Sequence, residues 1–303
     1  MNVDILFQIF MDVDDFFIQF DQEIQKLRLE SGLKSIRNRK TKLSESEMMT
    51  IYILFHHSHY NNFKAFYKEY VCVHLTGFFP NLVSYERFNT LQKRLLVPFI
   101  VFLKNCCLGK CRGINFIDST VLRVCHIKRE RQHKVFKHIA TKGKSTMGWF
   151  FGFKLHLIIN DKGEILSFYL SKANKDDRNR DIITLLTENI FGKIYADRGY
   201  ISKVLSDYLW NDGIHLVYKL RKNMKEQNIS DIDKVLLRKR ALIESVNDEL
   251  KNICSIEHTR HRSLQGFLNN LISGICAYHY LPKKPSLNIK PIRNNQLLLP
   301  YVA

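Results

Sequence analysis

The stretch that decides the fold of this chain is residues 150–170, which reads FFGFKLHLIINDKGEILSFYL. Apolar residues alternate with smaller or polar ones from position 150 to 160, which is typical of a strand with one buried face. Lys162-Gly163 is a turn signal, and the apolar run at 165–170 fits a returning strand. This stretch therefore predicts an antiparallel β-hairpin.

Shorter strands and helices are predicted further along the chain. Apolar runs at 114–117 and 193–196 are each followed by an aspartate, Asp118 or Asp197, and another strand is expected at 215–220. Helices are expected over residues 176–189, 202–211 and 236–253. Strands that alternate with helices in this way predict an α/β domain.

The first 110 residues favour helices instead. Ser44 and Glu47 have the spacing of a capping box before an apolar run, and Ser84 is a second helix start. Pro98 either interrupts the helix that follows or begins a new one. Four of the six prolines lie in the last 22 residues, so an extended tail is expected there.

The charge of the chain is strongly positive. Lys and Arg number 47 and Asp and Glu number 29, which gives a net charge of +18. Eleven of the basic residues fall within 110–154, where the acids are Asp118 and Glu130. Such an excess indicates a polyanionic partner, most commonly nucleic acid. Residues 1–30 differ, because seven acids and two basic residues give them a net charge of −5.

Composition excludes several classes of protein. With 45% hydrophobic residues the chain is not intrinsically disordered, and no apolar run approaches the roughly 20 residues that a membrane-spanning helix needs. The acidic N-terminus does not fit a secretory signal, and seven cysteines favour a reducing compartment, so we expect a cytoplasmic protein. No structural zinc is expected, since the cysteines between 106 and 125 form no Cys-x₂-Cys pair.

Three carboxylates are candidates for a site. Asp118 and Asp197 each follow a predicted strand, where α/β sheets present active-site side chains. Glu244 shares one face of the predicted 236–253 helix with Arg240 and Lys251. The alternatives are two aspartates that cap turns and an ordinary Arg240–Glu244 surface ion pair. If the three carboxylates converge they need a cation, and Mg²⁺ with phosphate oxygens fits such a set and indicates phosphodiester chemistry.

These residues resemble the DDE transposases of bacterial insertion sequences, most closely the group numbered 982. The resemblance covers roughly residues 40–283 and rests on the order of the carboxylates, which are 79 and 47 residues apart. The segments that carry it are Phe116–Thr120, Gly152–His156, Ala173–Arg178, Ala196–Tyr200, the Arg240-x₃-Glu244-x₆-Lys251 pattern and Glu257–Ser263. One departure is Leu237, where related families place a tyrosine.

The resemblance implies the fold and the residues of the site. It implies a ribonuclease-H-like mixed sheet flanked by helices and preceded by an all-helical N-terminal domain. Asp118, Asp197 and Glu244 would be the catalytic triad that binds Mg²⁺, with Mn²⁺ as a substitute. The DNA contacts would come from Arg240, Lys251, Lys154, His156, Arg198, Arg260 and Arg262. For Lys154 and His156, an outward position on an amphipathic strand is an equal alternative.

The predicted function is that of a transposase. It would bind the inverted-repeat ends of a bacterial insertion sequence as a homodimer, cleave the double-stranded DNA and join the freed 3′-hydroxyl to target DNA in the nucleoid. The predicted regions are 1–112 as a helical DNA-binding region, 113–281 as the catalytic domain and 282–303 as the tail. Two alternatives stay open: a ribonuclease-H-like nuclease that does not integrate, and a catalytically silent DNA-binding relic.

Overall fold

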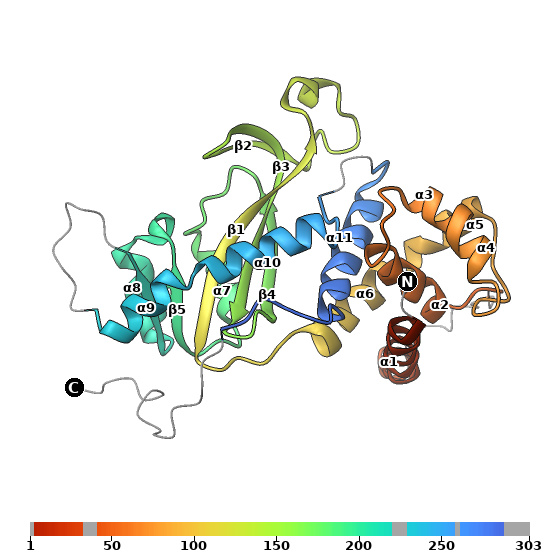
Figure 1. Ribbon diagram of the computed structural model, residues 1–303, viewed down its shortest axis with the longest axis horizontal. Helices are drawn as coiled ribbons and strands as arrows, with labels where there is room; N and C mark the ends of the chain where they lie inside the picture. The colour runs from red at the N-terminus through yellow and green to blue at the C-terminus, as the bar shows by residue number, and fades with distance from the viewer. Residues whose placement is uncertain (1–2, 33–40, 220–228, 258–260, 288–303) are drawn as a thin grey trace. The chain divides into compact units, whose positions relative to one another are not determined.

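The computed structural model describes residues 3–32, 41–219, 229–257 and 261–287 (Figure 1). By its contacts the chain divides into two compact units. The first comprises Met1–Cys107 and Leu250–Leu281, and the second comprises Leu108–Glu249 and Pro282–Ala303. Within the described residues, no helix combines the length and the apolar character needed to cross a membrane. The functional regions expected from the sequence stay a prediction.

The described part of the first unit is built from helices. They are α1 (Val3–Glu30), α2 (Glu45–His56), α3 (Phe63–Ala65), α4 (Cys72–His74), α5 (Tyr85–Leu91), α6 (Leu96–Phe102) and α11 (Leu264–His279), with short π or 3₁₀ turns between some of them. The predicted capping box is confirmed: the Ser44 hydroxyl accepts from Glu47 N, and the Glu47 carboxylate accepts from Ser44 N. Ser84 caps α5, and Pro98 lies in the first turn of α6.

Helix α11 forms the centre of the first unit and was not predicted. Nearly every residue from Phe267 to Tyr278 is buried, so the helix lacks the amphipathic period that marks surface helices. It packs on α2, where the buried His56 ring bonds Ser273 Oγ through Nε2 at 2.8 Å. Gly274 permits this packing, because a Cβ there would lie 2.5 Å from Ile256 Cγ2.

The second unit contains a six-stranded mixed sheet. Its strands are β1 (Ile114–Cys125), β2 (Thr141–Ser145), β3 (Gly148–Asn160), β4 (Ile165–Lys172), β5 (Gly192–Ala196) and β6 (Ile214–Tyr218). The order is β2-β3-β1-β5-β6, and β4 also pairs with β3. The β1–β3, β2–β3 and β3–β4 pairs are antiparallel, whereas β1–β5 and β5–β6 are parallel.

The predicted hairpin is confirmed, and β1 is longer than predicted. Strands β3 and β4 pair across the turn at Lys162-Gly163. The expectation that Asp118 ends its strand is wrong, since β1 continues to Cys125 and pairs with β3 along this length. The physical reason is the long partner strand β3, which offers hydrogen bonds beyond Asp118. Asp197, in contrast, directly follows β5 as predicted.

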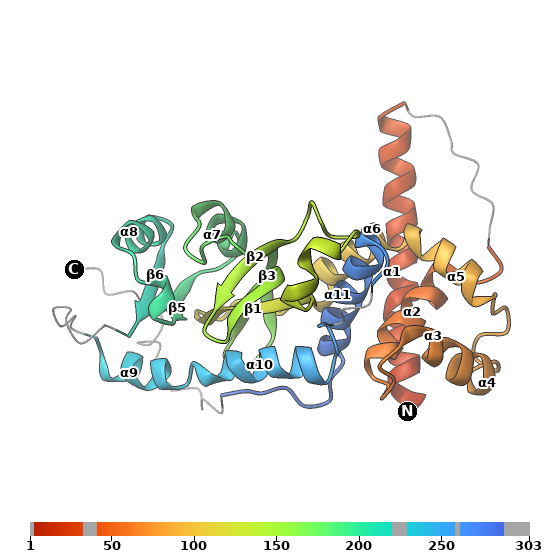
Figure 2. The same ribbon diagram turned by 90° about the horizontal axis from the view of Figure 1, so that it is seen from above.

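Helices cover both faces of the sheet (Figure 2). Helices α7 (Arg180–Thr187) and α8 (Lys203–Asn211) lie on one face, and α9 (Asp231–Arg238) and α10 (Ala241–Asn252) lie along the other. The single helix predicted at 236–253 is wrong, because the chain turns at Lys239 and Arg240. The helix predicted at 176–189 begins only at Arg180, since Asn179 caps it.

The main core of the second unit lies between the sheet and α7 and α8. Its members are Ile117, Ile158, Leu166, Ile182, Ile183, Leu186, Ile190, Ile194, Ala196, Tyr200, Leu205, Leu209, Ile214, Leu216 and Tyr218. Neighbouring residues in a strand point to opposite faces. Because Ile117 and Ala196 face this core, Asp118 and Asp197 lie toward the α9–α10 face.

A buried carboxylate ties α9 to β5. Asp233 accepts hydrogen bonds from Tyr195 Oη at 2.7 Å, Ser230 Oγ at 2.7 Å and Lys193 Nζ at 2.9 Å. Burial alone would raise the pKa of Asp233, but these three donors hold that pKa below its ordinary value. The carboxylate is therefore satisfied only in its ionised form.

We predict that Asp233→Asn destabilises the protein by about 1–3 kcal/mol at pH 7, because the amide cannot satisfy all three donors. Since the folded pKa is lowered, this contribution is present above the ordinary pKa and is lost as the pH falls below about 4. Urea unfolding across this range measures both effects. Asp231→Asn is the control, as Asp231 is almost fully exposed and pairs only with Lys234 at the surface. Equal losses in the two variants would contradict the prediction.

Candidate active site

The parallel pairing of β1 and β5 brings Asp118 and Asp197 together. The register pairs Ile114 with Lys193 and Phe116 with Tyr195, a constant offset of 79 residues. Continued by two residues, the same offset sets Asp118 level with Asp197. Adjacent strands lie about 4.8 Å apart, so the two carboxylates start from neighbouring backbone positions on one face of the sheet. Two residues far apart in the sequence thus form one acidic site.

Arg240 links this pair to Glu244. Its Nη1 lies 3.7 Å from Asp118 Oδ1, and its Nη2 donates to Glu244 Oε1. Arg240 is mostly buried, whereas more than half of the Glu244 side chain is exposed. Glu244 is therefore held at the edge of the site by the guanidinium between the two acids.

Asn247 completes the immediate surroundings of Asp118. Its Nδ2 donates to Asp118 Oδ2 at 3.2 Å, and its own Oδ1 is buried without a hydrogen-bond partner. Asn247 lies one helical turn after Glu244, so α10 presents both side chains to the same side. The site thus contains an unsatisfied amide oxygen beside the buried carboxylate.

The electrostatics of Asp118 are strained in the absence of added positive charge. Burial raises the pKa of Asp118 to about 7, and the nearby Asp197 and Glu244 act in the same direction, while Arg240 opposes them. Only 21% of the side chain remains exposed. A buried carboxylate among other acids is stabilised by a cation that binds them together.

The residues present fit a divalent cation only in part. Carboxylate and amide oxygens are the ligands that Mg²⁺ prefers, and Asp118, Asp197 and Asn247 supply them. However, among the residues that the structure describes, no three His, Cys, Asp or Glu side chains are gathered closely enough to hold a metal ion. The reason is the Glu244 carboxylate, which pairs with Arg240. A complete triad requires Glu244 to leave Arg240.

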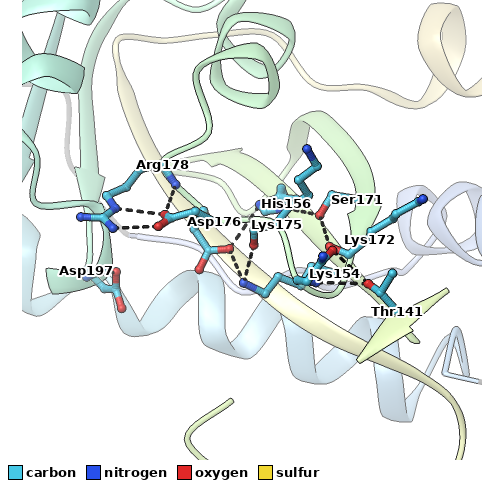
Figure 3. A network of polar contacts seen from close by, with 12 residues as sticks. Thr141, Lys154, His156, Ser171, Lys172, Lys175, Asp176, Arg178 and Asp197 are labelled. Carbon is cyan, nitrogen blue, oxygen red and sulfur yellow. Dashed lines mark hydrogen bonds and ion pairs between the residues drawn. The ribbon is translucent and has the colours of Figure 1, made fainter. Parts of the chain in front are cut away.

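A second polar network lies beside the acidic pair and fixes the loop of residues 173–179 (Figure 3). Lys154 Nζ donates to Lys175 O and to Asp177 Oδ1, both at 3.0 Å. His156 Nε2 bonds Ser171 Oγ at 2.8 Å, and His156 Nδ1 is buried 3.8 Å from Asp177 Oδ1. The side chains of β3 and β4 therefore anchor the loop through Asp177.

Other contacts hold the same loop at its two ends. Asp176 accepts from Arg178 Nε at 3.0 Å and Nη2 at 2.7 Å, and these bonds lower the pKa of Asp176 to about 2. Thr141 Oγ1 donates to Asn174 Oδ1 at 3.0 Å. The buried Tyr200 hydroxyl has no hydrogen-bond partner, and the charges of Asp177, Asp118 and Asp197 add to burial in raising the Tyr200 pKa. Tyr200 thus places the loop close to the acidic pair.

The remaining predicted DNA contacts fall into three groups. His156 is completely buried and its ring is neutral at pH 7, since burial lowers its pKa to about 4. A direct contact between His156 and DNA is therefore wrong for this conformation, and His156 supports the loop instead. Arg198 is exposed beside Asp197. Lys251, which pairs with Glu257 at 3.3 Å, and Arg262 belong to the first unit, while Arg260 lies outside the described residues.

Asn247, Asp177 and Tyr200 were missed as site residues by the sequence analysis. Asn247 could have been found, because at about 100° per residue it falls within roughly 20° of Arg240 on the helical face. Asp177 lies in a segment that was quoted only for its resemblance. Tyr200 gave no signal of its own, since an apolar ring with a buried hydroxyl is an ordinary core residue.

A carboxylate pair with cationic neighbours at the end of parallel strands defines a class of α/β sites that handle phosphates with a divalent ion. Residues 108–264 match the family described as "Transposase DDE domain". Because this match covers more than half of the 303 residues, the chain belongs to the transposase DDE domain family.

Two further comparisons add little. No curated protein sequence matches the chain. Among solved structures the chain is similar to one described as a piggyBac transposase synaptic complex with hairpin DNA, with a TM-score of 0.44 and 11% identity. The similarity covers 84% of this chain and 70% of that chain. A TM-score of 0.44 is too low to argue from.

We predict that Asp118→Asn stabilises the metal-free protein by about 2 kcal/mol at pH 8. Because the folded pKa of Asp118 lies above its ordinary value, stability falls as the pH rises from about 4 to 7, and the neutral amide avoids this loss. The gain should shrink toward zero near pH 4. Urea unfolding in chelator measures it, with Asp207→Asn on the exposed surface of α8 as the control. Equal stabilities of wild type and Asp118→Asn at pH 8 would refute the prediction.

Proposed function

We propose that this chain is a transposase of the insertion-sequence group numbered 982, which cleaves DNA and joins a freed 3′-hydroxyl to target DNA. The observation that carries this proposal is the level position of Asp118 and Asp197 on β1 and β5. Family membership supports it, since the match spans the segment that contains Asp118, Asp197 and Glu244. The mixed sheet with helices on both faces agrees with a ribonuclease-H-like core.

The proposed ligands of Mg²⁺, or of Mn²⁺ in its place, are Asp118, Asp197 and Glu244. When bound, such an ion would stabilise charge on the attacking and leaving oxygens of a phosphodiester. Arg240 would keep Asp118 and Glu244 close together and then contact a phosphate. Asn247 would orient Asp118 through the bond that it already donates.

Exposed basic groups of the second unit support a DNA partner. Lys142 and Lys144 lie 6.0 and 5.9 Å from the centre of the Trp149 ring, and 59% of Trp149 is exposed. Lys128, Arg129 and Arg131 follow β1 and are partly or fully exposed. Lysine and arginine neutralise phosphates, and an exposed indole stacks on bases. We propose double-stranded transposon ends and target DNA as the partners, bound by a homodimer in the bacterial cytoplasm.

We predict that Asp118→Asn, Asp197→Asn and Glu244→Gln each reduce Mg²⁺-dependent cleavage by at least about 100-fold. The assay follows nicking of a labelled duplex taken from the DNA that borders the gene, and its joining to a supercoiled plasmid. Asp248→Asn is the matched control, because Asp248 is an exposed acid on the same helix. A second readout is the melting temperature, which Mg²⁺ should raise in wild type and not in Asp118→Asn.

The outcomes separate the alternatives. Nicks without joined products would indicate a nuclease that does not integrate. DNA binding with no nicking in Mg²⁺ or Mn²⁺ would indicate a catalytically silent relic. Full activity in all three acidic-site variants would overturn the assignment of these residues.

A further inference from the structure

The acidic N-terminal helix has a second apolar face that nothing in its own unit covers. Helix α1 packs into the first unit through Leu6, Ile9, Val13, Phe16 and Phe17. A different set of large apolar side chains on the same helix is half or more exposed, namely Val3, Phe7, Met11, Ile18 and Leu29. We call this set the α1 stripe.

The α1 stripe is one continuous surface. At about 100° per residue its five members fall within a sector of roughly 80°, and the sector of the buried residues is separate. Scattered exposed apolar residues are ordinary, but a row along a 28-residue helix, about 42 Å long, marks an interaction surface. Phe7 extends the row to Phe78, whose ring centroid lies 5.7 Å away.

The charges of α1 indicate what covers the stripe. Residues 3–23 contain six acids and no Lys or Arg, while Lys26 and Arg28 lie near the C-terminal end. The acids would repel DNA phosphates and anionic lipid headgroups, so neither is a suitable partner. A second copy of the same helix in antiparallel orientation sets the acidic part of each helix beside the basic part of the other. A parallel pair would place acid beside acid.

We propose that α1 pairs with α1 of a second copy of this chain, antiparallel and centred on Ile18, and that this dimer forms without DNA. In this alignment Ile18 meets its own counterpart, and Phe7 of one chain meets Leu29 of the other. Each chain would bury on the order of 500 Å² of apolar surface, at the low end of specific interfaces, so a micromolar dimer is expected. This inference does not rest on the proposed function.

The first test is the mass of the full chain in solution. After nuclease treatment, light scattering at micromolar concentration should give about twice 35.8 kDa. The double variant Met11→Asp/Ile18→Asp should shift dissociation at least 100-fold, so that a monomer is observed. Leu27→Asp is the matched control: Leu27 is also 56% exposed, as Met11 and Ile18 are, but it lies about 180° from the middle of the stripe. Circular dichroism verifies that all variants keep their helix content.

The second test is the orientation of the two helices. Met11 and Gln25 lie seven residues to either side of Ile18, so antiparallel pairing brings Met11 of one chain to Gln25 of the other. Tagged Met11→Cys mixed with Gln25→Cys should form a disulfide between the two chains. A disulfide between two Met11→Cys chains would overturn the antiparallel arrangement. A monomeric wild type, or equal weakening by Leu27→Asp, would overturn the α1 dimer whatever the outcome of the DNA assays.

Discussion

The parallel pairing of β1 with β5 is the constraint on which the acidic site depends. Its offset of 79 residues is also the sequence separation of Asp118 and Asp197, so both carboxylates reach the same level of the sheet. A register change of one residue would point one of them into the apolar core, because side chains alternate between faces. The core residues Ile117 and Ala196, which immediately precede the two aspartates, therefore fix the register that assembles the site.

Burial of that pair explains the polar groups around it. A carboxylate with a pKa raised to about 7 needs donors or a cation, and Arg240 and Asn247 supply what the protein itself can offer. Arg240 can reach Asp118 because the chain turns between α9 and α10, which places this residue just before α10 rather than inside a longer helix. The turn also explains why Glu244 is exposed: Arg240 draws it to the edge of the site.

Local patterns in the sequence predicted the local parts of this structure. The hairpin of β3 and β4 and the caps at Ser44 and Ser84 follow from side-chain alternation and short-range hydrogen bonds, so a single segment contains the information. The extent of β1 and the burial of His156 depend on partners far away in the sequence, which the local pattern does not contain. Helix α11 was missed because burial on all sides removes the amphipathic period.

The acidic N-terminal residues make sense once α1 has two apolar faces. A helix that only capped the first unit would need one apolar face, and its outer face could be charged throughout. Instead Met11 and Ile18 interrupt the acids on that outer face. Carboxylates would also keep the outer face away from the phosphates that the basic surface of the second unit attracts. Separating the two signs of charge along the chain thus keeps protein pairing and DNA binding on different surfaces.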